Sequence, residues 1–192
     1  MITFFTLFPD RLNLNGDQAN IFVLQQRLAW QGIESELVAI ESLAVLQGQD
    51  LTGKFLLIGH GSNAAMRTLE ESASELRDEI FDLAREGLVG LAVGSGYELL
   101  FPDFTRGERL SDYADVPAQG WLPQLFGYIN TDTNLPTATV IGDAFVCTMV
   151  HGPVLARSPE LADKLIEKLG VVPNETKHSI EADGYATRAR EH

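Results

Sequence analysis

Residues 88–101, with the sequence LVGLAVGSGYELLF, constrain the fold of this chain more than any other segment. The first six residues form a short apolar run without polar alternation, which is typical of a strand buried on both faces of a parallel sheet. Gly94-Ser95-Gly96 then predicts a tight turn, and apolar residues resume at helical spacing from Tyr97. The segment therefore predicts a strand, a sharp turn and the start of a helix, an arrangement that presents the nucleophile in several enzyme folds.

The apex of such a turn can be located by steric reasoning. Strand and helix pass so close together that the residues two before and two after the apex must be small. With Gly94 at the apex these flanking residues are Ala92 and Gly96, which fit, whereas Ser95 at the apex would be flanked by a valine and a tyrosine. An elbow here would therefore have glycine where a nucleophile should stand. The segment alone also fits an ordinary glycine turn.

The first hundred residues alternate strand and helix patterns. Short apolar runs predict buried strands at 2–7 and 55–58, and alternation predicts a further strand at 33–40. Apolar residues at helical spacing predict helices from Asp17 to Gly32 and over 66–86. This β-α-β order predicts an α/β fold with a doubly wound, mostly parallel sheet, whose ligands bind at the carboxyl ends of the strands.

The second half of the chain is less regular. Residues 102–119 are rich in Pro, Gly and Asp and give no clear pattern, while strands are predicted over 125–130 and 139–150. The latter segment is expected to form an antiparallel hairpin or ribbon, broken at Gly142-Asp143. Ser158 and Pro159 predict the start of a helix that runs to Gly170. We expect one domain over 1–170 and a loosely held polar tail over 171–192.

Three predicted loops leave the carboxyl ends of strands, and they hold Asp17, His60 and the turn at Gly94. His151, directly before Gly-Pro, would present a general base to that turn, although a lone histidine there is also common as a loop residue. Asp17 is expected to cap a helix, and it could alternatively orient His151 or bind a ligand amine. Cys147 lies four residues before His151 on the same predicted strand, about 13 Å away, and is expected in the core.

Composition excludes some classes of partner. The 192 residues carry 27 acidic and 14 basic side chains, and the net charge of −13 argues against nucleic acid or an anionic membrane. No segment approaches the ~20 apolar residues of a membrane span, and the amino end lacks a basic signal-peptide region. A single cysteine fits a reducing compartment, so we expect a cytoplasmic protein. We expect neither a metal nor a cofactor.

Several short blocks together resemble the class I glutamine amidotransferases of the cobyric acid synthase type. The family includes glutaminase subunits that supply ammonia to a Mur-ligase-like amide synthase, and the resemblance implies a flavodoxin-like architecture. It is carried by Phe8-Pro-Asp10, Leu12-Asn-Leu14, Gly16-Asp17, Asn20, the turn at Gly94, His151-Gly-Pro153 and Ser158-Pro-Glu-Leu-Ala162.

The resemblance assigns roles to the candidate site residues. The family's catalytic cysteine is replaced by Gly94, and its next glycine by Ser95, while Gly96 and Tyr97 keep the following glycine and aromatic positions. His151 takes the place of the base. The oxyanion loop is matched by Gly59-His60-Gly61, but the Gln-Asp that follows it in the family is replaced by Ser62-Asn63. Arg109 matches a family position only loosely and is given no role.

These departures lead to two hypotheses of different class. In the first, the chain is a catalytically inactive amidotransferase-like subunit that binds a partner amide ligase or a small glutamine-like ligand. In the second, it is an enzyme, either because the nucleophile was replaced in the expressed chain or because a different chemistry uses His151, His60 and Asp17. A plain α/β binding domain without any link to nitrogen transfer is the third alternative.

Overall fold

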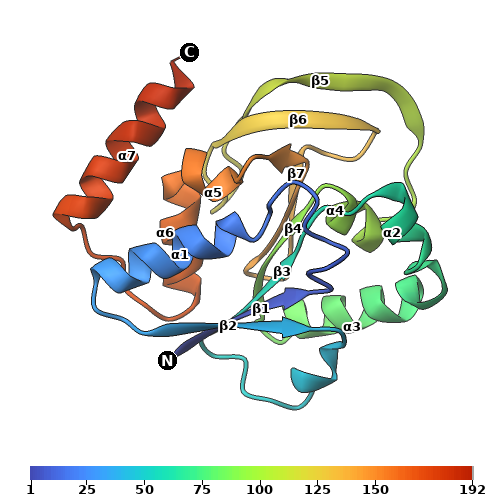
Figure 1. Ribbon diagram of the computed structural model, residues 1–192, viewed down its shortest axis with the longest axis horizontal. Coiled ribbons are helices and arrows are strands. Elements are labelled where there is room, and N and C mark those ends of the chain that lie inside the picture. The colour runs from blue at the N-terminus through green and yellow to red at the C-terminus, as the bar shows by residue number, and fades with distance from the viewer. Residues whose placement is uncertain (192) are drawn as a thin grey trace.

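A computed structural model describes residues 1–191. The centre of the fold is a six-stranded sheet (Figure 1). Its strand order is β2-β1-β3-β4-β8-β7, and every neighbouring pair is parallel except β7 and β8. The five parallel strands follow the flavodoxin order, which confirms the predicted fold class. The strands are β1 (Ile2–Leu7), β2 (Ser35–Ile40), β3 (Lys54–Ile58), β4 (Val89–Val93), β7 (Ala138–Ile141) and β8 (Phe145–Thr148).

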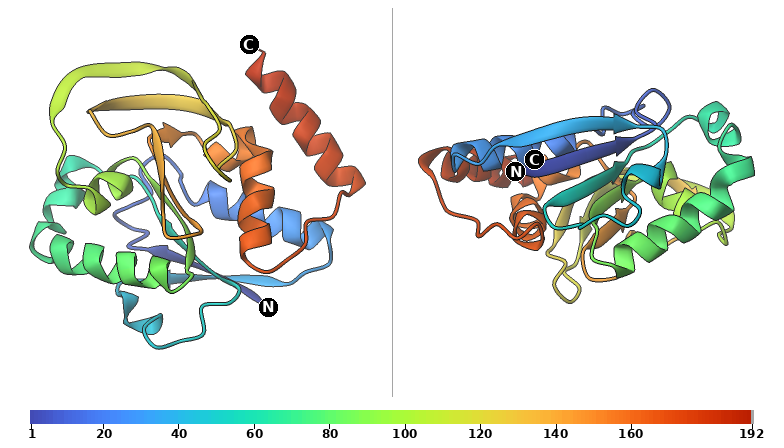
Figure 2. Two further views of the ribbon diagram at one scale, coloured as in Figure 1. Left: turned by 180° about the vertical axis from the view of Figure 1, so that it is seen from behind. Right: turned by 90° about the horizontal axis from the view of Figure 1, so that it is seen from below.

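Helices cover both faces of this sheet (Figure 2). One layer contains α1 (Ala19–Trp30), α5 (Val154–Arg157), α6 (Pro159–Lys168) and α7 (Lys177–Arg190), which contact one another. The other contains α2 (Asn63–Arg67), α3 (Ala73–Arg85) and α4 (Ser95–Leu100), and 3-10 turns lie at Leu43–Val45 and Glu70–Ser72. The aromatic side chains of Phe4, Phe55 and Phe145 are fully buried in the sheet between the layers. None of the helices within residues 1–191 is both long and apolar enough to cross a membrane.

A second, antiparallel sheet includes one strand from the segment that gave no clear sequence pattern and the strand predicted over 125–130. It consists of β5 (Arg106–Val116), β6 (Leu125–Thr133) and β9 (Val150–His151), with β6 in the middle. The long β5–β6 ribbon arches over one end of the central sheet (Figure 1). The predicted late hairpin is formed by β7 and β8, but the chain leaves the central sheet after Thr148. Cys147 and His151 therefore do not share a strand, contrary to expectation.

The helix expected over 66–86 begins only at Ala73. The preceding residues form α2, which ends because the hydroxyl of Thr68 donates to the Ala65 carbonyl at 2.6 Å, and then the 3-10 turn. Side-chain hydroxyls that satisfy backbone carbonyls compete with helix propagation at such positions. The predicted helix is thus confirmed from Ala73 to Arg85, and its predicted start at residue 66 is wrong.

The expectation of a loosely held tail is wrong for the residues of α7. Thr176 and Ser179 form a reciprocal capping box at the start of this helix, in which the Ser179 N–H donates to the Thr176 hydroxyl at 3.1 Å. The helix then packs against α1 and α5. Its polar sequence gave no sign of this contact, because it buries only Ser179 and Ala186.

Candidate functional site

The turn between β4 and α4 is a sharp elbow with Gly94 at its apex. Gly94 has φ 56° and ψ −117°, a backbone conformation that only glycine adopts without strain. Gly96 also has to be small, because a Cβ there would lie 2.6 Å from the Ile58 carbonyl oxygen. The structure thus places Gly94 where the side chain of a nucleophile would stand clear of the sheet.

Two histidines fill the space in front of Gly94. A Cβ added at Gly94 would lie 2.4 Å from His60 Nδ1 and 2.5 Å from His151 Cε1, well inside van der Waals contact. The two imidazole rings meet edge to face, with centroids 5.1 Å apart and an interplanar angle of 87°. A side chain at position 94 would therefore have to displace both rings.

The backbone donors beside the elbow already have acceptors within the protein. In elbow enzymes the N–H that follows the nucleophile is one donor of the oxyanion hole, and here the Ser95 N–H donates to His60 Nδ1 at 3.0 Å. On the facing loop, the Gly61 N–H donates to the Ser95 hydroxyl at 2.7 Å, and that hydroxyl donates back to the Gly61 carbonyl at 3.1 Å. A developing oxyanion would have to break both contacts before it could bind here.

Burial disfavours the protonated form of both histidines. Burial lowers the pKa of His151 to about 4, with a further contribution from the neighbouring charge of His60. Burial also lowers the pKa of His60. Because Nδ1 of His60 accepts the Ser95 N–H, its own proton lies on Nε2. A base with a pKa near 4 is poorly matched to proton abstraction at neutral pH.

Asp17 joins this cluster by a contact other than the expected helix cap or a hydrogen bond to His151. It does not cap α1, whose N-cap residue is Gln18, and its carboxylate instead accepts the His60 N–H at 2.8 Å. Burial raises its pKa to about 6, partly offset by backbone hydrogen bonds. Asp17 therefore fixes the loop that carries His60 rather than the imidazole of His151.

The side chain that forms a hydrogen bond with His151 is that of Asn15, which was not predicted as a site residue. Its amide Nδ2 lies 3.3 Å from His151 Nδ1, and it comes from the same loop as Asp17. With the amide oriented in this way, Nδ1 of His151 is an acceptor. The signal available in the sequence was the position of Asn15, on a loop that leaves the carboxyl end of β1.

The remaining candidates pack in the core, support the elbow or lie on the surface. Tyr97 is fully buried and packs edge to face on Phe101, with ring centroids 5.2 Å apart, so it belongs to the core. Cys147 is buried in β8 beside β4, and burial raises the pKa of its thiol. Arg109 lies exposed on β5. Gly59 permits close packing, because a Cβ there would overlap the Leu12 carbonyl oxygen at 2.0 Å.

Comparison with known proteins gives one similar sequence. The chain is 24% identical to the Lipid II isoglutaminyl synthase (glutamine-hydrolyzing) subunit GatD of Staphylococcus aureus over 208 aligned positions. The alignment covers 87% of this chain and 84% of that protein. Over most of its length, the chain is similar to a subunit of a glutamine-hydrolysing synthase.

Two further comparisons carry less information. No protein-family model matches the chain. Among solved structures, a glutamine amidotransferase from Thermotoga maritima aligns with 99% of this chain and 92% of its own, at 15% identity and a TM-score of 0.45.

Proposed function

We propose that this chain is a glutamine amidotransferase-like subunit that does not hydrolyse glutamine. The observation that carries the proposal is the filled elbow: Gly94 offers no nucleophile, and His60 and His151 occupy the space that its side chain would need. Amide hydrolysis by this class of site requires a thiolate, which forms the thioester and releases ammonia. The glycine removes that covalent route.

The state of the oxyanion donors supports the same proposal. Without a nucleophile, an elbow site could retain a residual rate only through donors aimed at the developing charge. Here the N–H groups of Ser95 and Gly61 are bonded to His60 and to the Ser95 hydroxyl. Ser95 cannot replace the missing nucleophile, because its hydroxyl is buried and held by Gly61.

We further propose that the chain acts as a binding or regulatory subunit of an amide-forming synthase. The similar Staphylococcus aureus protein is named as a subunit of a synthase, which supports a partner of this kind. A chain with the fold of a glutaminase and a filled elbow could still stabilise or regulate a ligase that takes its ammonia from elsewhere. A small glutamine-like molecule is the alternative ligand, and it would have to displace the His60 ring to reach Gly94.

The first experiment measures ammonia release from glutamine by the purified chain and by its Gly94→Cys variant, with trapping of a thioester. Both proteins should be inactive, the variant because its new side chain collides with two imidazoles. Ammonia release by the unmodified chain would refute the proposal. Activity of the variant alone would leave the proposal intact for the natural chain and would show that the two rings move aside easily.

The partner role is tested separately. An affinity-tagged chain should co-purify with an ATP-dependent amide ligase from its own source cells, and the complex should survive the Gly94→Cys substitution. Recovery of the chain without any such ligase would contradict the partner role. It would not affect the conclusion on glutamine hydrolysis.

A further inference from the structure

A separate cavity of about 650 Å³ lies between α7 and the helices α1 and α5, away from the elbow. Its walls are largely apolar and include Phe22 and Trp30 from α1, Leu155 from α5 and Tyr185 from α7. This volume falls in the range of pockets that take small molecules, which are typically lined by apolar and aromatic side chains. Neither His60, Gly94 nor His151 contributes to the walls.

The face of α7 that borders the cavity consists largely of alanines. Ala182, Ala186 and Ala189 line it and are spaced by four and three residues, so they share one face of the helix. The larger apolar residues of α7, Ile180 and Tyr185, are 58% and 61% exposed. A helix that served only to close the core would turn such residues inward.

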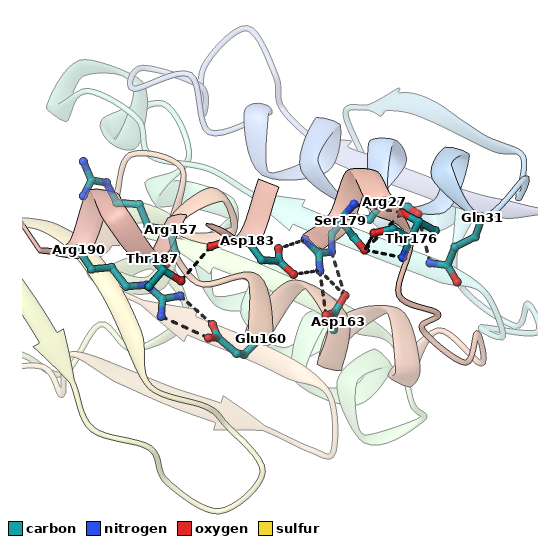
Figure 3. A network of polar contacts seen from close by, with 10 residues as sticks. All are labelled: Arg27, Gln31, Arg157, Glu160, Asp163, Thr176, Ser179, Asp183, Thr187 and Arg190. Atoms are coloured by element: carbon teal, nitrogen blue, oxygen red, sulfur yellow. Dashed lines mark hydrogen bonds and ion pairs between the residues drawn. The ribbon is translucent and has the colours of Figure 1, made fainter. Parts of the chain in front are cut away.

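Polar contacts hold α7 in place instead (Figure 3). Asp183 accepts from Nη1 of Arg27 on α1 at 2.7 Å, and Arg190 binds Glu160 on α6 at 2.8 Å. Arg190 also donates through Nε to the Arg157 carbonyl at 2.8 Å. These anchors fix the helix at two points without filling the space between them, so the cavity does not collapse.

The charges around the cavity limit which ligands it can accept. The guanidinium of Arg27 uses four of its five N–H donors to bind Asp163 and Asp183, so two carboxylates share this one cation. The other cation in the wall, Arg157, lies over the Tyr113 ring and donates to the Ala189 carbonyl. The two arginines and the two aspartates balance one another, so the cavity has no net charge that would offset the cost of burying an ion.

We propose that this cavity binds a small apolar molecule, aromatic or aliphatic, that carries no charge. Such a ligand would cover Phe22, which is 55% exposed although it is a large apolar residue, and the inner side of Tyr185. Removal of this apolar surface from water supplies the binding free energy. The anchors of α7 leave the walls preformed, so little ordering opposes binding.

The neutral dye N-phenyl-1-naphthylamine tests the proposal by its fluorescence increase on entering an apolar site. The unmodified chain should bind the dye saturably. Ala182→Phe, which fills the cavity, and Phe22→Ala, which removes a wall, should each weaken binding by about tenfold or more. Thr187→Phe adds the same ring to α7 at an exposed residue outside the cavity and should bind like the unmodified chain.

The variants remain informative because Phe22 is half exposed and its truncation does not empty the core; circular dichroism checks that each variant is folded. Dye binding that is absent in the unmodified chain, or unchanged in Phe22→Ala and Ala182→Phe, would overturn the proposal. Decan-1-ol should displace the dye more strongly than decylamine or decanoate at about 0.15 M salt, where long-range interactions with the acidic chain are screened. Equal displacement by either ion would overturn the restriction on ligand charge.

Discussion

Because two imidazoles fill the space in front of Gly94, an added methyl group there should lower the free energy of unfolding, and the contribution of the imidazoles can be measured separately. In Gly94→Ala the new Cβ would lie 2.4 Å from His60 Nδ1 and 2.5 Å from His151 Cε1. Overpacking of this kind costs about 1–3 kcal/mol. The backbone, at φ 56° and ψ −117°, adds a strain of about 1–3 kcal/mol for any residue with a side chain. We expect the variant to lose about 2–6 kcal/mol of unfolding free energy.

A mutant cycle separates these two terms. The cost of Gly94→Ala is measured by urea unfolding in the natural chain and again in a His60→Ala/His151→Ala background. Without the imidazoles only the backbone strain remains, so the cost should fall by about 1–3 kcal/mol. Gly87→Ala is the matched control, because Gly87 has φ 101° but nothing within 4 Å of its added Cβ, and its cost should be equal in both backgrounds.

Equal costs for Gly94→Ala in the two backgrounds would refute this reasoning. They would mean that the imidazoles do not occupy the space in front of the elbow in solution. The absent thiol would then be the one remaining reason to expect no glutamine hydrolysis. A reduced cost at Gly87 as well would instead indicate that the two histidine substitutions had loosened the whole chain.

Further predictions concern the titrating groups and the anchored helix. The pKa of Asp17 is raised from 3.8 to about 6, so its ionisation opposes folding and stability falls as the pH rises between these two values. In urea unfolding, Asp17→Asn should therefore gain up to about 3 kcal/mol of unfolding free energy at pH 8 but little below pH 4. The pKa of His151 is lowered from 6.5 to about 4, so its protonation opposes folding at lower pH. The stability lost between those values, up to about 3 kcal/mol, should be largely absent in His151→Gln, and an unchanged pH profile would contradict this. Asp183→Asn leaves Arg27 with Asp163 as its remaining partner, and should lower the local stability of α7 by about 1–2 kcal/mol. Faster amide hydrogen exchange confined to 177–190 would show this loss, whereas unchanged exchange there would count against the anchor.

The central sheet was predictable because its signals are local. Each parallel strand is a short apolar run followed by a helical pattern, and this order fixes the sheet class without any knowledge of distant contacts. The elbow was predictable for a related reason. Close passage of strand and helix requires small residues at Ala92 and Gly96, and only Gly94 satisfies that spacing.

The elements that were missed depend on partners far along the chain. Nine of the 11 residues of β5 are exposed and none is buried, so no apolar alternation signals a strand there. The ribbon exists because β6 pairs with β5. The helix α7 is stabilised by Arg27, which lies 156 residues away from Asp183. Isolated helices of this length are marginal in water, so such a contact decides whether the helix forms.

The site shows the same division. The rule that parallel strands end at one edge predicts that the loops of Asp17, His60 and Gly94 meet there, and they do. The rule does not predict which atoms pair once they meet. Asp17 serves as an acceptor for a backbone N–H, a role that its position before a helix disguised as a cap.

The two residues of the elbow that differ from the resembling family, Gly94 and Ser95, take part in the same closed arrangement. His60 and His151 occupy the space in front of Gly94, and His60 also gives the Ser95 N–H an acceptor. The hydroxyl of Ser95, at a position where the resembling family has glycine, satisfies the Gly61 N–H on the opposite loop. Buried donors without acceptors cost about 1–3 kcal/mol each, so the closed site is more stable than an open one in the absence of substrate. Because His60, His151 and Ser95 maintain this closure, a thiol introduced at Gly94 would leave all three in place to oppose catalysis.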